Sequence, residues 1–126
     1  MSDVFINDII GKDGVTMILP KADKVIIPIE KLTEYALSPE RDPNKAKAFE
    51  MALGYDRNNA DKLLQNILHN LEKYEAKNKG NYGYGEKYEV VMNINGENGK
   101  SAKVLTAWLD DAETGEMRLI TLYVDS

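Results

Sequence analysis

Cysteine is absent from this chain of 126 residues, so neither a disulfide framework nor a thiolate metal site can form. That absence is typical of a reducing compartment. Histidine occurs once, which excludes a ribonuclease mechanism that uses two histidines. The serine-hydrolase, Walker, zinc-protease, calcium-loop and dinucleotide-binding signatures are missing as well. The sequence therefore predicts no metal site and no cofactor.

Long apolar runs are also missing, because no stretch approaches the roughly 20 residues that span a bilayer, and residues 1–5 lack a signal-peptide layout. We expect a soluble cytoplasmic protein without a membrane partner, or a domain delivered into the cytoplasm of a target cell. A basic patch is absent too: the net charge is −5, and residues 82–126 carry four basic and eight acidic residues. This excess of acid argues against a DNA partner and, less strongly, against any enzyme that acts on RNA.

The C-terminal third contains three runs rich in β-branched and aromatic residues, separated by two turn-rich segments. This alternation predicts an antiparallel three-stranded meander. The predicted strands are Tyr88–Ile94, Ala102–Leu109 and Met117–Val124. The second of them is apolar on both faces, which is typical of a central strand.

Helical spacing of apolar residues predicts three helices upstream of the meander: Glu30–Leu37, Lys45–Leu53 and Ala60–Tyr74. The predicted fold is α+β, with these helices packed on one face of the C-terminal antiparallel sheet. His69 projects away from the apolar face of its helix, so we expect it in solvent.

The remaining segments complete this organisation as one domain over residues 19–126. Residues 1–18 read as a linker or a short N-terminal strand. Two β-branched runs, Val15–Pro20 and Lys24–Pro28, are candidates for an N-terminal edge strand. The polar and glycine-rich segment Glu75–Tyr84 is predicted to be an exposed loop.

Cleavage of RNA by its own 2′-hydroxyl needs a base, an acid and groups that stabilise the developing negative charge. Polar, basic and aromatic side chains on the predicted helices and strands are of the types that can supply them. The candidates are Lys45, Tyr84, Lys87, Thr106, Trp108, Arg118, Thr121 and Tyr123. Lys45 flanks the buried stripe of its helix, whereas Lys47 points away. Arg118 and Thr121 fall on opposite faces of their strand unless a bulge intervenes. The alternative interpretation is that Trp108 and Tyr123 are core aromatics and that Arg118 ends a strand in solvent.

Several segments carry a family resemblance, among them N-K-A-K-A-F-E-M-A-L-G-Y, Y-G-E-K-Y-E-V-V-M-N-I-N-G-E-N-G-K and R-L-I-T-L-Y-V. Over about Leu19–Val124 the chain resembles small bacterial and phage domains of unknown function, found at the C-termini of polymorphic-toxin and phage minor-head-like proteins. Positions that match are Lys45, Phe49, Leu53, Gly54, Tyr55, Gly85, Tyr88, Gly96, Asn98, Gly99, Trp108, Arg118, Leu119 and Tyr123. Helices before a meander make the domain similar to the barnase, EndoU, colicin and RelE class of ribonuclease toxins.

One departure concerns the segment before Lys45, where relatives carry a histidine in an N-P-x-H pattern and this chain has Ser38–Asn44. Arg41 either replaces that histidine in a histidine-free mechanism or marks an inactive member.

The resemblance implies a toxin-type, metal-independent ribonuclease that acts on an RNA substrate and has an immunity protein or another protein as partner. The catalytic candidates are Lys45, Arg118, Thr121 and Tyr123. The substrate-binding candidates are Arg41, Thr106, Trp108 and Lys87. The alternative is a non-catalytic protein-interaction domain, associated with a phage or a toxin, or an inactivated relative.

Overall fold

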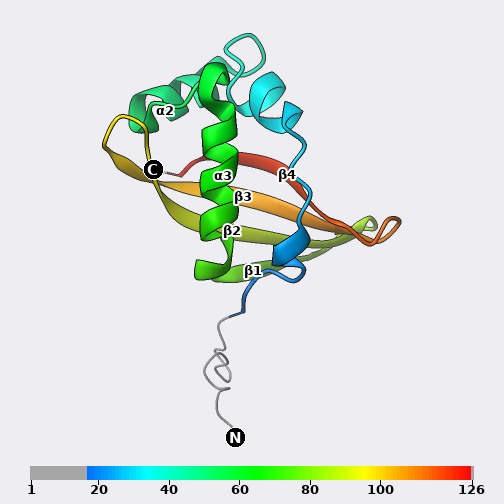
Figure 1. Cartoon of the computed structure of the whole chain (residues 1–126). Coiled ribbons are helices and arrows are strands. Elements are labelled where there is room, and N and C mark those ends of the chain that lie inside the picture. The colour runs from blue at the N-terminus through cyan, green and yellow to red at the C-terminus, as the bar shows by residue number, and fades with distance from the viewer. Residues whose placement is uncertain (1–16, 126) are drawn as a thin grey trace, which may run out of the picture.

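A computed structural model describes residues 17–125, which form a four-stranded antiparallel sheet with helices on one side (Figure 1). The strand order follows the sequence. The strands are β1 (Ala76–Asn81), β2 (Gly85–Asn95), β3 (Ser101–Asp111) and β4 (Met117–Val124). The predicted meander is therefore confirmed as β2, β3 and β4.

The fourth strand, β1, occupies a segment that the sequence predicted as an exposed loop, and this prediction was wrong. Its lysines, asparagines and glycine have low β propensity. An edge strand needs only one bonded neighbour, however, and lysines on it protect the edge from pairing with other chains. Ala76 is buried at its start, and the register with β2 shifts at a bulge between Asn78 and Gly80.

The predicted N-terminal strands are not formed by the described residues of Val15–Pro20 and Lys24–Pro28. Ile26 makes a single parallel bridge to Arg118 in β4. Its N–H donates to the Met117 carbonyl at 2.8 Å, and its carbonyl accepts from the Leu119 N–H at 2.9 Å. Pro28 has no N–H to continue such pairing. Most of the predicted linker, residues 1–18, lies outside the described residues.

The three predicted helices are confirmed, with different ends. They are η2 (Lys31–Ala36), which is a π-helix, α2 (Pro43–Leu53) and α3 (Ala60–Asn70). The last is extended by a 3₁₀ turn, η4 (Leu71–Lys73). Helix α2 ends at Leu53 and is capped by Gly54, whose positive φ of 75° is the left-handed conformation that glycine favours.

The core lies between the helices and one face of the sheet (Figure 1). Helix α2 contributes Phe49 and Leu53, and α3 contributes Leu63 and Ile67. The sheet contributes Val90, Met92, Trp108, Leu119 and Leu122. Burying an apolar side chain of this size stabilises the fold by about 1.5–3 kcal/mol. The α+β arrangement thus follows from one shared apolar layer.

Strand β4 contains a bulge that decides which side chains share a face. Ala107 pairs with Thr121, but the next residue, Trp108, pairs with Leu119, so Ile120 is the extra residue. Directly opposed residues share a face of the sheet. Arg118 and Thr121 therefore lie on the same face, as partners of Leu109 and Ala107. The bulge that the sequence left open is present.

We call the face opposite the core the open face. Three cross-strand rows run over it from β2 to β4. The rows are Lys87–Leu109–Arg118, Glu89–Ala107–Thr121 and Val91–Leu105–Tyr123.

Candidate functional site

Lys45 in the first turn of α2 is the centre of the candidate site. Its Nζ donates a hydrogen bond to Thr121 Oγ1 at 3.2 Å and lies 6.0 Å from the centroid of the Tyr123 ring. That distance is at the limit of a cation–π contact. Three of the four predicted catalytic residues therefore lie together, held by one helix and one strand.

A pocket of about 280 Å³ lies beside Lys45 at the outer edge of β4. Its lining combines three cations, one carboxylate, one aromatic ring and one hydroxyl. These groups belong to Lys31, Arg41, Lys45, Asp42, Tyr35 and Thr121. We call it the β4-edge pocket. Among residues 17–125 none of its three cations forms an ion pair, so their charge is free for an anionic ligand.

Tyr35 arranges two of these cations. The Arg41 guanidinium carbon lies 4.4 Å from the ring centroid and Lys31 Nζ lies 5.3 Å from it. Such contacts contribute about 0.5–1 kcal/mol each at an exposed site. The Tyr35 ring thus holds Arg41, which the sequence predicted to bind substrate, in the lining of the pocket. Tyr35 itself is 42% exposed, because η2 bonds as a π-helix and this changes the phase of its side chains.

Asp42 is the pocket's one carboxylate among the described residues, and sequence reasoning missed its place here. As the N-cap of α2 it accepts a hydrogen bond through Oδ1 from the Lys45 N–H at 3.1 Å. Pro43 follows as the first helical residue, which is the favoured order. The order Asp-Pro before a helix was the available signal, because an N-cap aspartate stands one turn from Lys45.

Arg118 lies apart from this site, at the hairpin end of β4. Its Nε is 4.0 Å from Asp111 Oδ2, and an Nη is 3.5 Å from Glu116 Oε1. It is three positions from Thr121 along the strand, roughly 10 Å. The arginine shares a face of the sheet with Thr121 and Tyr123, but two carboxylates already offset its charge.

Lys87, a predicted substrate-binding residue, stands in the same cross-strand row as Arg118. Its Nζ lies 5.6 Å from the ring of Tyr82. Lys87 is two strands away from Arg118, or about 10 Å. It therefore belongs to the hairpin end of the open face and not to the pocket.

Thr106 and Trp108, also predicted to bind substrate, are fully buried on the core face. Trp108 Nε1 donates to Thr106 Oγ1 at 2.8 Å, and that hydroxyl donates to the Val90 carbonyl at 2.8 Å. Both polar groups are satisfied within the protein, as buried polar groups require. A base cannot stack on Trp108 in this structure, so the core-aromatic alternative describes this residue.

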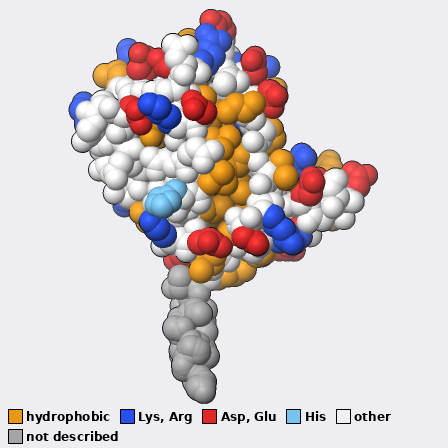
Figure 2. All heavy atoms as spheres, in the orientation of Figure 1, with side chains coloured by type: hydrophobic (Ala, Val, Ile, Leu, Met, Phe, Trp, Pro, Cys, Tyr) orange, Lys and Arg blue, Asp and Glu red, His pale blue; other side chains and the backbone are white. Residues whose placement is uncertain are grey.

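Other features of the described residues add little to the site. His69 is exposed on α3, as predicted (Figure 2). Within residues 17–125 no three histidine, aspartate or glutamate side chains gather closely enough to hold a metal ion. In the same range no helix is long and apolar enough to cross a bilayer.

Fold and pocket define an α+β domain in which helices cover one face of a four-stranded antiparallel meander and a cationic pocket adjoins its last strand. Residues 18–126 match the model of the family DUF6883, a domain of unknown function, and the chain belongs to that family. No curated protein and no solved structure matches the chain significantly.

Proposed function

We propose that this domain is a toxin-type ribonuclease that cleaves RNA without a metal ion, with the scissile phosphodiester in the β4-edge pocket. One observation carries the proposal. Lys31, Arg41 and Lys45 converge on a 280 Å³ pocket and, within residues 17–125, form no ion pair. Three unneutralised cations in a pocket of this size fit a phosphate that gains charge during the reaction.

The proposed reaction begins when the Asp42 carboxylate takes the proton of the 2′-hydroxyl. The 2′-oxygen then forms a bond to phosphorus while the bond from phosphorus to the 5′-oxygen breaks. The Tyr123 phenol gives its proton to the departing 5′-oxygen. Lys45 and Arg41 stabilise the negative charge on the two remaining phosphate oxygens. The products are a 2′,3′-cyclic phosphate and a 5′-hydroxyl.

Thr121 has a positioning role in this scheme. Its hydroxyl accepts the hydrogen bond from Lys45 Nζ at 3.2 Å, so it fixes the ammonium group between the pocket and Tyr123. A long lysine side chain otherwise samples many rotamers, and the cost of ordering it opposes catalysis. In this proposal Arg41 supplies the cation that relatives replace with a histidine.

A second candidate function is binding of another protein without catalysis. Figure 2 shows hydrophobic side chains gathered in a band beside α3. Large hydrophobics left exposed include Ile18 at 48%, Leu68 at 41% and Ile29 at 39%. Contiguous exposed apolar surface is typical of protein-binding sites. An inactive relative that only binds a partner would keep this surface.

The two functions are separated by incubating purified protein with transfer RNA, messenger RNA and ribosomes in the presence of a chelator. The ribonuclease is expected to give discrete fragments that end in a 2′,3′-cyclic phosphate. In parallel, induced expression in a bacterium is expected to arrest growth as the RNA is fragmented. Intact RNA in every arm, with normal growth, rejects the ribonuclease and favours the binding function.

A further inference from the structure

The open face carries a second cavity, of about 460 Å³, which we call the β1–β2 hollow. It lies on the side of the sheet away from α3 and the rest of the core. Its lining combines Val91, Tyr74 and Asn93 with three lysines and two carboxylates: Lys77, Lys79, Lys103, Glu75 and Glu89. Its volume falls within the range of small-molecule sites. None of these residues belongs to the β4-edge pocket.

The lysines of the hollow have unequal partners. Lys79 Nζ lies 4.0 Å from Glu89 Oε1, so its charge is partly offset. Lys77 and Lys103 form no ion pair with any residue of the range 17–125. One lies on β1 and the other on β3. In a chain with a net charge of −5, two unneutralised lysines on either side of one cavity favour an anionic ligand.

The row Val91–Leu105–Tyr123 runs from the hollow to Tyr123, which lies near Lys45. These residues are direct cross-strand partners, so Val91 and Tyr123 lie two strand spacings apart, about 10 Å. Val91 is 36% exposed and Tyr123 is 39% exposed. Lys45 Nζ lies 6.0 Å from the Tyr123 ring. Leu105 between them is 8% exposed, so Val91 and Tyr123 are the two exposed ends of an apolar row, each with a lysine nearby.

From this arrangement we infer that the β1–β2 hollow binds a nucleotide of single-stranded RNA that flanks the cleaved phosphodiester. The inference rests on the proposed ribonuclease function. Its base lies against Val91 and Tyr74, and its phosphates contact Lys77 and Lys103. Single-stranded RNA presents unstacked bases together with regularly spaced charge, which an apolar surface bordered by lysines complements. An acidic peptide could also contact the two lysines, but it has no flat base to pack against Val91, so RNA fits the hollow better.

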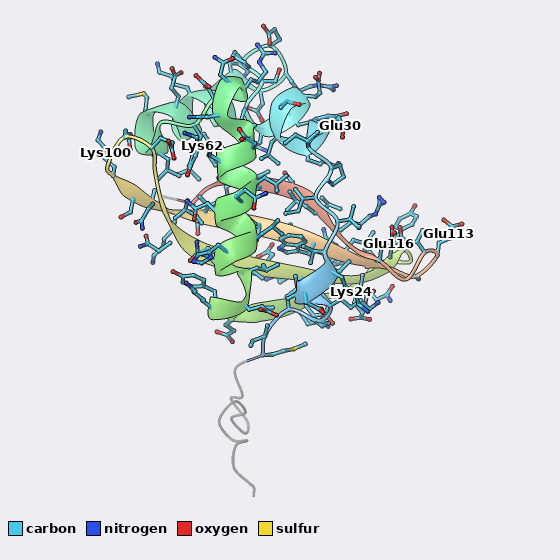
Figure 3. All side chains as sticks on the ribbon, in the orientation of Figure 1. Lys24, Glu30, Lys62, Lys100, Glu113 and Glu116 are labelled. Carbon is cyan, nitrogen blue, oxygen red and sulfur yellow. The ribbon has the colours of Figure 1, made fainter. Side chains whose placement is uncertain are left out.

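The test measures binding of a fluorescent 2′-O-methyl oligoribonucleotide, which cannot be cleaved through its 2′-oxygen. The double variant Lys77→Ala/Lys103→Ala is compared with Lys24→Ala/Lys62→Ala. Figure 3 labels Lys24 and Lys62, and Lys62 lies on α3, across the sheet from the hollow. Both variants lose the same charge, and all four lysines are exposed. Thermal melting of each variant establishes that it is folded.

Two lost phosphate contacts lower the slope of log K against log salt by about 1.4, which corresponds to binding roughly 25-fold weaker near 0.1 M salt. We expect this change for Lys77→Ala/Lys103→Ala and a much smaller one for the control pair. Equal losses in both double variants would mean that only overall charge matters, and would overturn the inference. Equally tight binding of polyglutamate that depends on the same two lysines would also overturn it, in favour of an acidic protein ligand.

The outcome for the hollow is independent of the outcome for catalysis. If the wild type binds the oligonucleotide through Lys77 and Lys103 but cleaves no RNA, the binding site stands and the proposed activity fails. If it cleaves RNA and the two lysine pairs behave alike, the activity stands and the inferred subsite fails.

Discussion

Lys45 and Thr121 are 76 positions apart in the chain, and the side chain of the first donates a hydrogen bond to that of the second at 3.2 Å. The bulge at Ile120 makes this contact compatible with the sheet, because it restores Thr121 to the face that Arg118 and Tyr123 share. The first turn of α2 is thereby joined to the open face at one point. The catalytic proposal depends on that junction.

Replacing Lys45 with alanine tests the junction directly. Lys45→Ala removes the cation nearest to both Thr121 and Tyr123, so RNA cleavage is expected to fall by about 10²–10³-fold, as when one charge-stabilising donor is lost. The rate of fragment formation at saturating RNA measures the loss.

The matched control is Lys47→Ala, because Lys47 lies on the same helix and is exposed. It removes the same charge and is expected to leave cleavage unchanged. Equal activity of the two variants would take Lys45 out of the reaction.

Asp42 allows its two roles to be separated, since asparagine caps a helix about as well as aspartate but is a poor proton acceptor. Asp42→Asn is expected to keep the melting temperature while cleavage drops by about 10²–10⁴-fold. Asp42→Ala is expected to lose the same activity and also about 1 kcal/mol of stability. A fully active asparagine variant would assign the proton transfer to another group.

The sequence predicted the helices and β2 to β4 because each presents an apolar stripe of the right period. It missed β1, where one buried alanine at the start gives almost no pattern. It predicted from the helix angle that Lys45 flanks the buried stripe, and this side chain is half-buried. Trp108 was misassigned for a physical reason: β3 is apolar on both faces, so alternation alone cannot tell which face the helices cover. Arg41 and Asp42 line the same pocket as Lys45. Their positions depend on the N-cap of α2 and on the π-helical turn η2, which local periodicity does not encode.

The buried pair Thr106 and Trp108 gives a prediction about stability alone. Thr106→Val leaves the Trp108 indole N–H and the Val90 carbonyl without their present partner, so unfolding free energy is expected to fall by about 1–3 kcal/mol. Trp108→Phe in that background removes the orphaned donor, and its further cost is expected to be smaller than in the wild type.

Denaturant titrations of the two single variants and the double variant measure this coupling. Cleavage per folded molecule should stay unchanged throughout. A specific loss of activity at unchanged stability would restore Trp108 as a substrate contact.

Glu40, next to Arg41 of the β4-edge pocket, is expected to make the stability of the fold depend on pH. Its carboxylate is stabilised first by its own backbone N–H and then by Arg57, which lies 3.1 Å away, and these lower its pKa below the ordinary value of 4.5. Because the folded pKa is depressed, its contribution to stability is present above pH 4.5 and is lost as the pH falls through the folded value. Carbon-detected NMR titration should show the low pKa, and Arg57→Ala should raise it. A pKa at or above 4.5 in the wild type would remove this source of acid sensitivity.

Gly85 and Gly83 form the last matched pair, at the start of β2 and in the turn before it. Both have positive φ, 137° and 103°, so alanine is strained at either position by about 1–3 kcal/mol. At Gly85 a Cβ would also lie 1.9 Å from the Asp110 carbonyl oxygen, whereas at Gly83 nothing stands within 4 Å. Gly85→Ala must therefore separate β2 from β3 and is expected to destabilise the fold markedly more than Gly83→Ala. Equal melting temperatures for the two variants would mean that the start of β2 and the end of β3 do not approach each other this closely.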